Sequence, residues 1–261
     1  MKNSIQANQS IISQKTTRII LSAILMLFFY MQMWGSSEPT FTEGAQLYVV
    51  APSGLTIRHM ADADSEALDI VPFGSSVIVL AQPDKIPLNQ KINWVDGQWI
   101  YVEYAGITGY MFDGYLTDLP LPIYEFEKCQ MDMDFIYPLE SWSDINLGLD
   151  RSDTISAGAL YQVTNHYEAG DILIKRQVGM KYAIELTLND VRLMDAYHLL
   201  ISMMEDSRSI SVFKELTTFI EDANGDLSTI KIDVDYPMKI NKNKNGSITI
   251  LAATNNPVCG R

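Results

Sequence analysis

The segment SGLTIRHMADADSEALDIVPFGSSVIVL, residues 53–80, decides the architecture of the first half of the chain. Leu55 and Ile57 alternate with polar neighbours, which is the two-residue period of a strand with one buried face. Arg58 ends the alternation and begins a polar excursion. A second strand over 75–80 has apolar residues at successive positions, so we expect it to be buried on both faces. The segment therefore predicts two core strands separated by a charged loop.

The loop between these strands is acidic. It contains Asp62, Asp64 and Glu66 shortly after Arg58. We expect the guanidinium of Arg58 to pair with Asp62 or Asp64, because it stands where the strand leaves the core. That role would be structural, and it would leave the loop as an acidic wall beside the first strand.

The flanking sequence supplies further short strands. Residues 47–50 are strand-like, and a hairpin over 99–112 turns at Ala105-Gly106. Residues 113–116 have the composition of a short closing turn. Five short strands within about 75 residues predict a small β-barrel over 45–119.

A stiff connector follows this barrel. Two prolines within residues 119–122 favour an extended chain, and we place a domain boundary there. Apolar and polar residues then alternate from 124 to 135, as in strands. The strongest helical pattern of the chain runs from Asn189 to Glu205, where Asn189 can cap the first turn and Leu188 can pack against Leu193.

Three hairpins complete the second half. One turns near Gly179, and two turn at the Asn-Gly pairs 224–225 and 245–246. The expected fold class is thus a mainly β, SH3-like barrel followed by an α+β domain over 123–261, with an antiparallel sheet and one principal helix.

Residues 45–119 resemble bacterial SH3 (SH3b) domains over about 75 of the 261 residues. Five stretches carry the resemblance, and they follow one another in the family's order and spacing. They are Gly54–Arg58, Pro72-Phe73-Gly74 before 77–80, Trp99–Tyr104, Gly106–Met111 and Tyr115-Leu116. SH3b domains commonly act as targeting modules on exported bacterial proteins, and many bind cell-wall peptides. The resemblance therefore implies binding rather than catalysis. The chain departs from the family pattern in its acidic loop and in a longer loop over 82–96.

An aromatic group in this region suggests where a ligand would bind. Seven aromatic residues lie within 94–115, and those that do not fill the core could line a groove for an extended peptide. We predict the groove between loops 59–67 and 82–96, with contacts from Trp94, Trp99, Tyr115, Asp62 and Asp64. The carboxylates would select a ligand with amino groups. The expected partner is a cell-wall peptide or an envelope protein, and no cofactor is expected.

Charge excludes one class of partner. The chain has 32 acidic against 19 basic residues, a formal net charge of −13. Nucleic-acid binding depends on basic residues at phosphates, so this composition argues against it. An apolar fraction of 47% is sufficient for a packed core.

The first 37 residues have the order of a secretory signal. Their only charged side chains are basic, the apolar run Ile19–Trp34 spans 16 residues, and Gly35-Ser36-Ser37 follows. The run is shorter than the roughly 20 residues of a membrane span. We predict a signal peptide, with an uncleaved anchor as the alternative. The protein would then be periplasmic, envelope-bound or extracellular. It would meet the membrane only through this segment, and only if the segment stays uncleaved.

Export permits a disulfide between Cys129 and Cys259, the only two cysteines. Neither has the setting of a catalytic cysteine, which needs a nearby histidine and commonly a helix N-terminus. The chain has three histidines. His198 lies on the apolar side of the predicted helix, and we interpret it as a core residue. His59 belongs to the barrel loop, and His166 belongs to the second half of the chain.

Two further patterns were considered as acid–base or metal sites, and both have a simpler structural interpretation. Glu125, Glu127, Asp132 and Asp134 alternate with apolar residues, as on the solvated face of a strand. The run 222–226 resembles the start of a calcium loop but lacks its glycine and glutamate positions, so a hairpin turn is the better interpretation. Two alternatives to a binding protein stay open. One is a cell-wall hydrolase, if His166, Asp195 or Cys129 converge in 123–261, and the other is a structural component of envelope assembly.

Overall fold

The computed structural model describes residues 41–83, 90–92, 95–122, 135–204, 207–234 and 238–255. The predicted signal segment 1–37, Trp94, both cysteines and the alternating acids of 125–134 lie outside these residues. Every element described below belongs to one compact unit, Thr42–Arg261. Within the described residues, no helix is long and apolar enough to cross a membrane.

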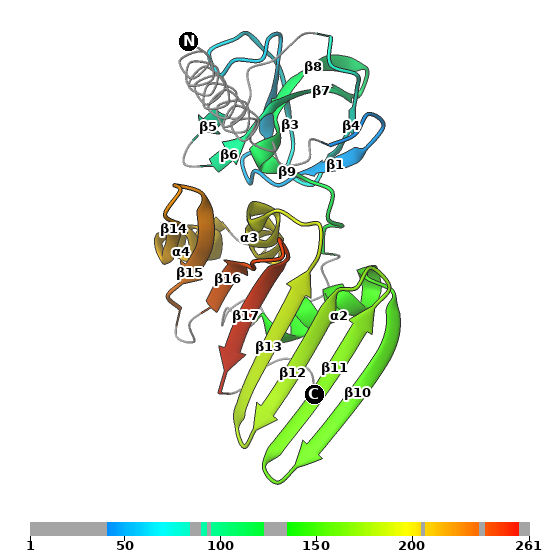
Figure 1. Ribbon diagram of the computed structural model, residues 1–261. Coiled ribbons are helices and arrows are strands. Elements are labelled where there is room, and N and C mark those ends of the chain that lie inside the picture. The colour runs from blue at the N-terminus through cyan, green and yellow to red at the C-terminus, as the bar shows by residue number, and fades with distance from the viewer. Residues whose placement is uncertain are drawn as a thin grey trace, which may run out of the picture. The chain divides into compact units, whose positions relative to one another are not determined.

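The first sheet has seven antiparallel strands in the order β3-β2-β8-β7-β4-β1-β9 (Figure 1). Its strands are β1 (Gln46–Val49), β2 (Leu55–Arg58), β3 (Ala67–Val71), β4 (Ser76–Val79), β7 (Trp99–Tyr104), β8 (Ile107–Phe112) and β9 (Leu116–Thr117). A separate two-stranded ladder joins β5 (Gln90–Ile92) to β6 (Val95–Gly97). No ladder among the described residues joins β3 to β9, so the sheet does not close, and the predicted small SH3-like β-barrel is not confirmed.

The segment 53–80 contains a strand that its sequence did not predict. β3 lies within the expected polar excursion and pairs with β2. Four of its five residues are exposed, so its pattern lacks the buried periodicity that marks a strand in sequence. The expectation of a doubly buried strand over 75–80 is wrong. Val77 and Val79 are buried, but Ile78 is 39% exposed, because only one face of β4 meets the core.

The hairpin over 99–112 has the predicted strands and turn. Tyr104 pairs with Ile107, and both turn residues have positive φ, 50° for Ala105 and 84° for Gly106. Gly109 of β8 allows a close approach of two strands, since a Cβ there would lie 2.6 Å from the Arg58 carbonyl oxygen. The predicted closing turn is a 3-10 helix, η1 (Asp113–Tyr115), which leads into β9.

The second sheet has eight antiparallel strands in the order β10-β11-β12-β13-β17-β16-β15-β14 (Figure 1). They are β10 (Leu149–Ala157), β11 (Leu160–Tyr167), β12 (Ile172–Val178), β13 (Lys181–Leu188), β14 (Thr217–Glu221), β15 (Leu227–Ile232), β16 (Met238–Lys242) and β17 (Ile248–Thr254). Two four-stranded meanders meet where β13 pairs with β17. All three predicted hairpins are present, with positive φ at Gly179, Gly225 and Gly246.

In the part of the second half that the structure describes, three helices accompany this sheet: α2 (Ile136–Asn146), α3 (Leu193–Ser202) and α4 (Ser207–Glu215). The prediction of one principal helix is therefore wrong. Phe135, expected at the end of a strand, is instead the N-cap residue of α2. α2 has Pro138 in its first turn, and α4 is short and largely polar, so neither segment stood out as a helix in the sequence.

α3 begins later than its sequence pattern suggested. Asp190 has a φ of 53°, and Arg192 rather than Asn189 is the N-cap residue. Asn189 is used elsewhere: its backbone N–H donates to Oδ1 of Asp171 at 2.7 Å. All ten residues of α3 are buried, and its apolar residues share one hydrophobic cluster with Trp99, Tyr110 and Phe112 of the first sheet.

Candidate functional site

The acidic loop between β2 and β3 is held by its own hydrogen bonds. Nη1 of Arg58 donates to the Ser65 carbonyl at 2.6 Å, and the Met60 backbone N–H donates to Oγ of Ser65 at 2.9 Å. Oδ1 of Asp62 accepts from the backbone N–H of Asp64 at 2.7 Å. The loop is thus ordered through Ser65 and Asp62. The predicted ion pair of Arg58 with Asp62 or Asp64 is not found among the described residues.

The carboxylates of this loop face water. Asp62, Asp64 and Glu66 are all exposed, and so is Asp69 of β3. Exposed apolar side chains accompany them: Met60 is 59% exposed, and two residues of β3 are also open to solvent. Because the carboxylate oxygens of Asp64 and Glu66 have no cation beside them among the described residues, this surface can attract an external positive charge.

The predicted aromatic contacts lie elsewhere. Trp99 is only 3% exposed; its indole Nε1 donates to Oε1 of Gln90 at 2.8 Å, and its ring meets Phe112 edge-on. Tyr115 is half-buried and lies between Phe112 and His198. Trp94 lies outside the described residues. Trp99 and Tyr115 therefore pack within the hydrophobic cluster instead of lining a groove beside Asp62 and Asp64.

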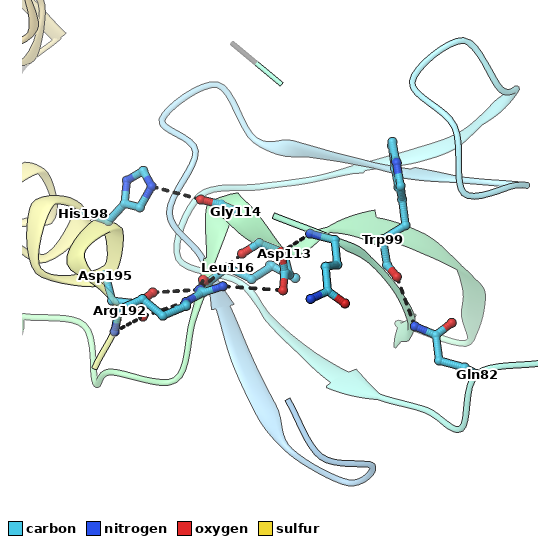
Figure 2. Close-up of polar contacts among 9 residues, drawn as sticks. Gln82, Trp99, Asp113, Gly114, Leu116, Arg192, Asp195 and His198 are labelled. Atoms are coloured by element: carbon cyan, nitrogen blue, oxygen red, sulfur yellow. Dashed lines mark hydrogen bonds and ion pairs between the residues drawn. The ribbon is translucent and has the colours of Figure 1, made fainter. Parts of the chain in front are cut away.

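A buried polar cluster is the second notable site, and the sequence did not predict it. It is built on Arg192, the N-cap residue of α3, whose guanidinium reaches η1 and β9 (Figure 2). Nη2 donates to the Leu116 carbonyl at 2.5 Å and to Oδ1 of Asp195 at 2.8 Å, and Nε donates to Oδ2 of Asp195 at 2.9 Å. Nη1 lies 3.5 Å from Oδ2 of Asp113. One side chain thus binds the first sheet and the first turn of α3 together.

Burial makes these contacts important. The side chains of Arg192, Asp113 and Asp195 are 19%, 6% and 3% exposed. Burial is the largest single influence and by itself would lower the pKa of Arg192. The charges of Asp195, Asp113 and Asp118, with the hydrogen bond to Asp195, together outweigh burial and raise that pKa. Asp113 is held from its own sheet, since Oδ1 accepts from the backbone N–H of Gln98 at 2.6 Å. Figure 2 shows Arg192 between the two carboxylates.

His198 adds a second contact between α3 and η1. Its Nε2 lies 3.2 Å from the Gly114 carbonyl, and its buried Nδ1 has no hydrogen-bond partner among the described residues. Burial lowers the pKa of His198 to about 4. The ring is therefore neutral at pH 7, with Nε2 as the donor. The sequence-based interpretation of His198 as a core histidine agrees with this placement, although its contact with Gly114 could not be predicted.

The chemistry of this cluster is structural. The Arg192 guanidinium is engaged by carboxylate and carbonyl oxygens of the chain itself, and a guanidinium does not exchange protons near neutral pH. The i,i+3 spacing of Arg192 and Asp195 could have been noticed in sequence. The third partner, Asp113, is far away in the chain and carries no sequence signal of the contact.

Of the residues considered for catalysis, Cys129 lies outside the described residues, and His166 and Asp195 have different partners. Nε2 of His166, on β11, lies 3.3 Å from Oδ2 of Asp153 on β10, whereas Asp195 is engaged by Arg192. The run 222–226 is a hairpin turn, in which Oδ1 of Asp222 accepts two backbone N–H groups. Within the described residues, no three His, Cys, Asp or Glu side chains are grouped as metal ligands.

Comparisons with known proteins were made at three levels. The chain matches no protein-family model, no curated protein and no solved structure.

Proposed function

We propose that the protein is a non-catalytic, exported envelope protein that binds a peptide bearing amino groups. The peptide would belong to the cell wall or to another envelope protein. The observation that carries this proposal is the acidic loop, in which Asp62 and Asp64 are exposed while hydrogen bonds through Ser65 hold the backbone. A preformed, negatively charged surface loses little conformational entropy when a cationic ligand binds.

Two further features support it. The resemblance of 45–119 to SH3b domains implies binding to the cell wall, and the antiparallel pairing of β2, β7 and β8 is compatible with it. The N-terminal apolar run supports export. Because Trp99 is buried, we leave it out of the proposed ligand contacts and keep the acidic loop and its surroundings.

A retention experiment tests the proposal. Full-length protein in a non-ionic detergent is incubated with purified cell-wall sacculi, and with soluble muropeptides in a parallel titration. We compare the wild type with the double variant Asp62→Asn and Asp64→Asn. Asparagine at 62 keeps the Oδ1 that accepts from the Asp64 N–H, so the loop is preserved while the charge is removed.

The matched control removes the same charge from other exposed positions. Glu103→Gln on β7 with Asp150→Asn on β10 serves this purpose, since both side chains are exposed. We expect the wild type and the control to be retained and the loop variant to be released. Absence of wild-type retention, or equal retention of all three proteins, would contradict the proposal.

A further inference from the structure

The two edge strands of the seven-stranded sheet, β9 and β3, differ in how far they are buried. At one end, both residues of β9 are buried, and the Leu116 carbonyl accepts a hydrogen bond from Nη2 of Arg192. At the other end, β2 is the only strand among the described residues that pairs with β3, and the four residues Ala67–Ile70 are exposed. A sheet edge without cover presents backbone donors and acceptors that can pair with another strand.

One backbone donor of β3 bonds to a side chain of the same strand. The N–H of Ile70 donates to Oδ1 of Asp69 at 2.8 Å, so a carboxylate of β3 itself takes up this donor. Asp69 is exposed, and its side chain can move away when a carbonyl oxygen is offered instead. The exchange would release the carboxylate for contact with a cation.

The side chains around β3 define the kind of strand that fits. Leu68 is 40% exposed, Ile70 is 60% exposed, and Met60 lies in the adjoining loop with 59% exposure. The exposed carboxylates of Asp62, Asp64 and Asp69 lie in the same loop and strand. Apolar and acidic groups together are complementary to an extended segment in which apolar and basic residues alternate.

We propose that β3 binds an extended peptide as an eighth strand of the first sheet. The peptide's backbone would pair with the open edge, its apolar side chains would contact Leu68 and Ile70, and its amino groups would approach Asp62, Asp64 and Asp69. This inference rests on the proposed function and specifies how the peptide binds. The occupant is a cationic peptide strand, selected by the charge of the loop and the open backbone of β3.

The test uses the end-blocked peptide Lys-Val-Lys-Val-Lys-Val and full-length protein in non-ionic detergent. Amide chemical shifts of 67–71 are followed during titration. Two further peptides have N-methyl groups on alternate residues, one on the lysines and one on the valines. An added strand directs alternate N–H groups toward its neighbour, so one methylated peptide should bind about tenfold more weakly or worse and the other should bind nearly as the parent does.

A protein variant gives the complementary measurement. Ile70→Pro removes the N–H that now donates to Asp69, and proline is tolerated at an edge strand where that group does not serve the sheet. Ile70→Thr is the control, because it shortens the side chain but keeps the N–H. We expect weaker peptide binding by Ile70→Pro than by Ile70→Thr, with both variants showing the wild-type amide spectrum outside β2 and β3.

Several outcomes would overturn strand addition. These are equal binding of the two methylated peptides, shifts confined to residues outside 58–71, or no saturation at millimolar peptide. Should Ile70→Pro lose the native spectrum, the methylated peptides alone decide the question. Retention of muropeptides together with equal binding of both methylated peptides would leave the proposed function intact and refute only this mode of binding.

Discussion

The β9 and β3 edges of the first sheet differ in what bonds to their backbone groups. A sheet that does not close leaves unpaired backbone groups at both ends. At β9 the second half of the chain supplies Arg192, which donates to the Leu116 carbonyl and is neutralised by Asp113 and Asp195. At β3 the protein uses an exposed carboxylate, Asp69, and a charged loop.

The difference separates an edge that we expect to matter for stability from an edge that we propose for binding. The β9 edge is buried and depends on a cationic side chain placed by tertiary structure, so changes there should affect folding. The β3 edge is exposed and satisfied locally, so changes there should affect binding and leave folding almost unchanged. Three substitutions test this division, from the largest expected effect to the smallest.

Arg192→Ala should be the most damaging. It leaves Asp113 and Asp195 buried without their cation, a loss that typically costs about 3–5 kcal/mol. Urea denaturation followed by circular dichroism measures the change in the free energy of unfolding. Arg151→Ala is the control, because the side chains of Arg151 and Asp153 are 61% and 56% exposed and such a pair contributes about 0–1 kcal/mol. Similar losses for the two variants would contradict a distinct role for the β9 edge.

His198→Gln should change how stability depends on pH. The pKa of His198 is lowered to about 4 by burial, so between pH 6.5 and 4 the unfolded chain binds a proton that the folded protein excludes. Wild-type stability is therefore lost as pH falls through this window, with a slope of up to about 1.4 kcal/mol per pH unit from this group.

Glutamine keeps a donor for the Gly114 carbonyl but does not titrate. Subtracting the unfolding free energies of wild type and variant at each pH cancels the contribution of groups that titrate alike in both proteins. We expect the wild type to lose up to about 2 kcal/mol relative to His198→Gln between pH 6.5 and 5. Parallel curves would show that His198 is accessible to protons in the folded protein.

Ile70→Lys should have the smallest effect on stability. Ile70 is 60% exposed on the open edge, and surface substitutions of this kind usually change the free energy of unfolding by less than about 0.5 kcal/mol. The same denaturation assay measures it. A loss of unfolding free energy as large as that of Arg192→Ala would mean that the β3 edge also contributes to stability. That result would contradict the difference that we infer between the two edges.

Local chemistry explains which elements were predictable. The Asn-Gly hairpins and the turn at Ala105-Gly106 depend on positive φ values that few residues tolerate, so their sequences reveal them. The helix over α3 was visible from its apolar period, but its start was not, because Asn189 binds Asp171 instead of capping. β3 was missed because an exposed edge strand has no buried face to impose a period.

The candidate site divides in the same way. The exposure of Asp62 and Asp64 could be anticipated, since charged residues in a loop stay in water. The burial of Trp99 could not, because alternation assigns faces of a strand without saying which face another part of the chain will cover. The link from Arg192 to Asp113 joins residues far apart in the chain, and nothing local records it.

By itself the sequence determined a mainly β chain, its hairpin turns, its acidic loop and the core position of His198, because these depend on backbone preference and hydrophobicity within a few residues. Only the tertiary structure decided that the first sheet stays open, that Arg192 covers one edge of it and that β3 is left exposed at the other. Those outcomes depend on which distant surfaces meet, and on the need to pair every charge and backbone group that such a meeting buries.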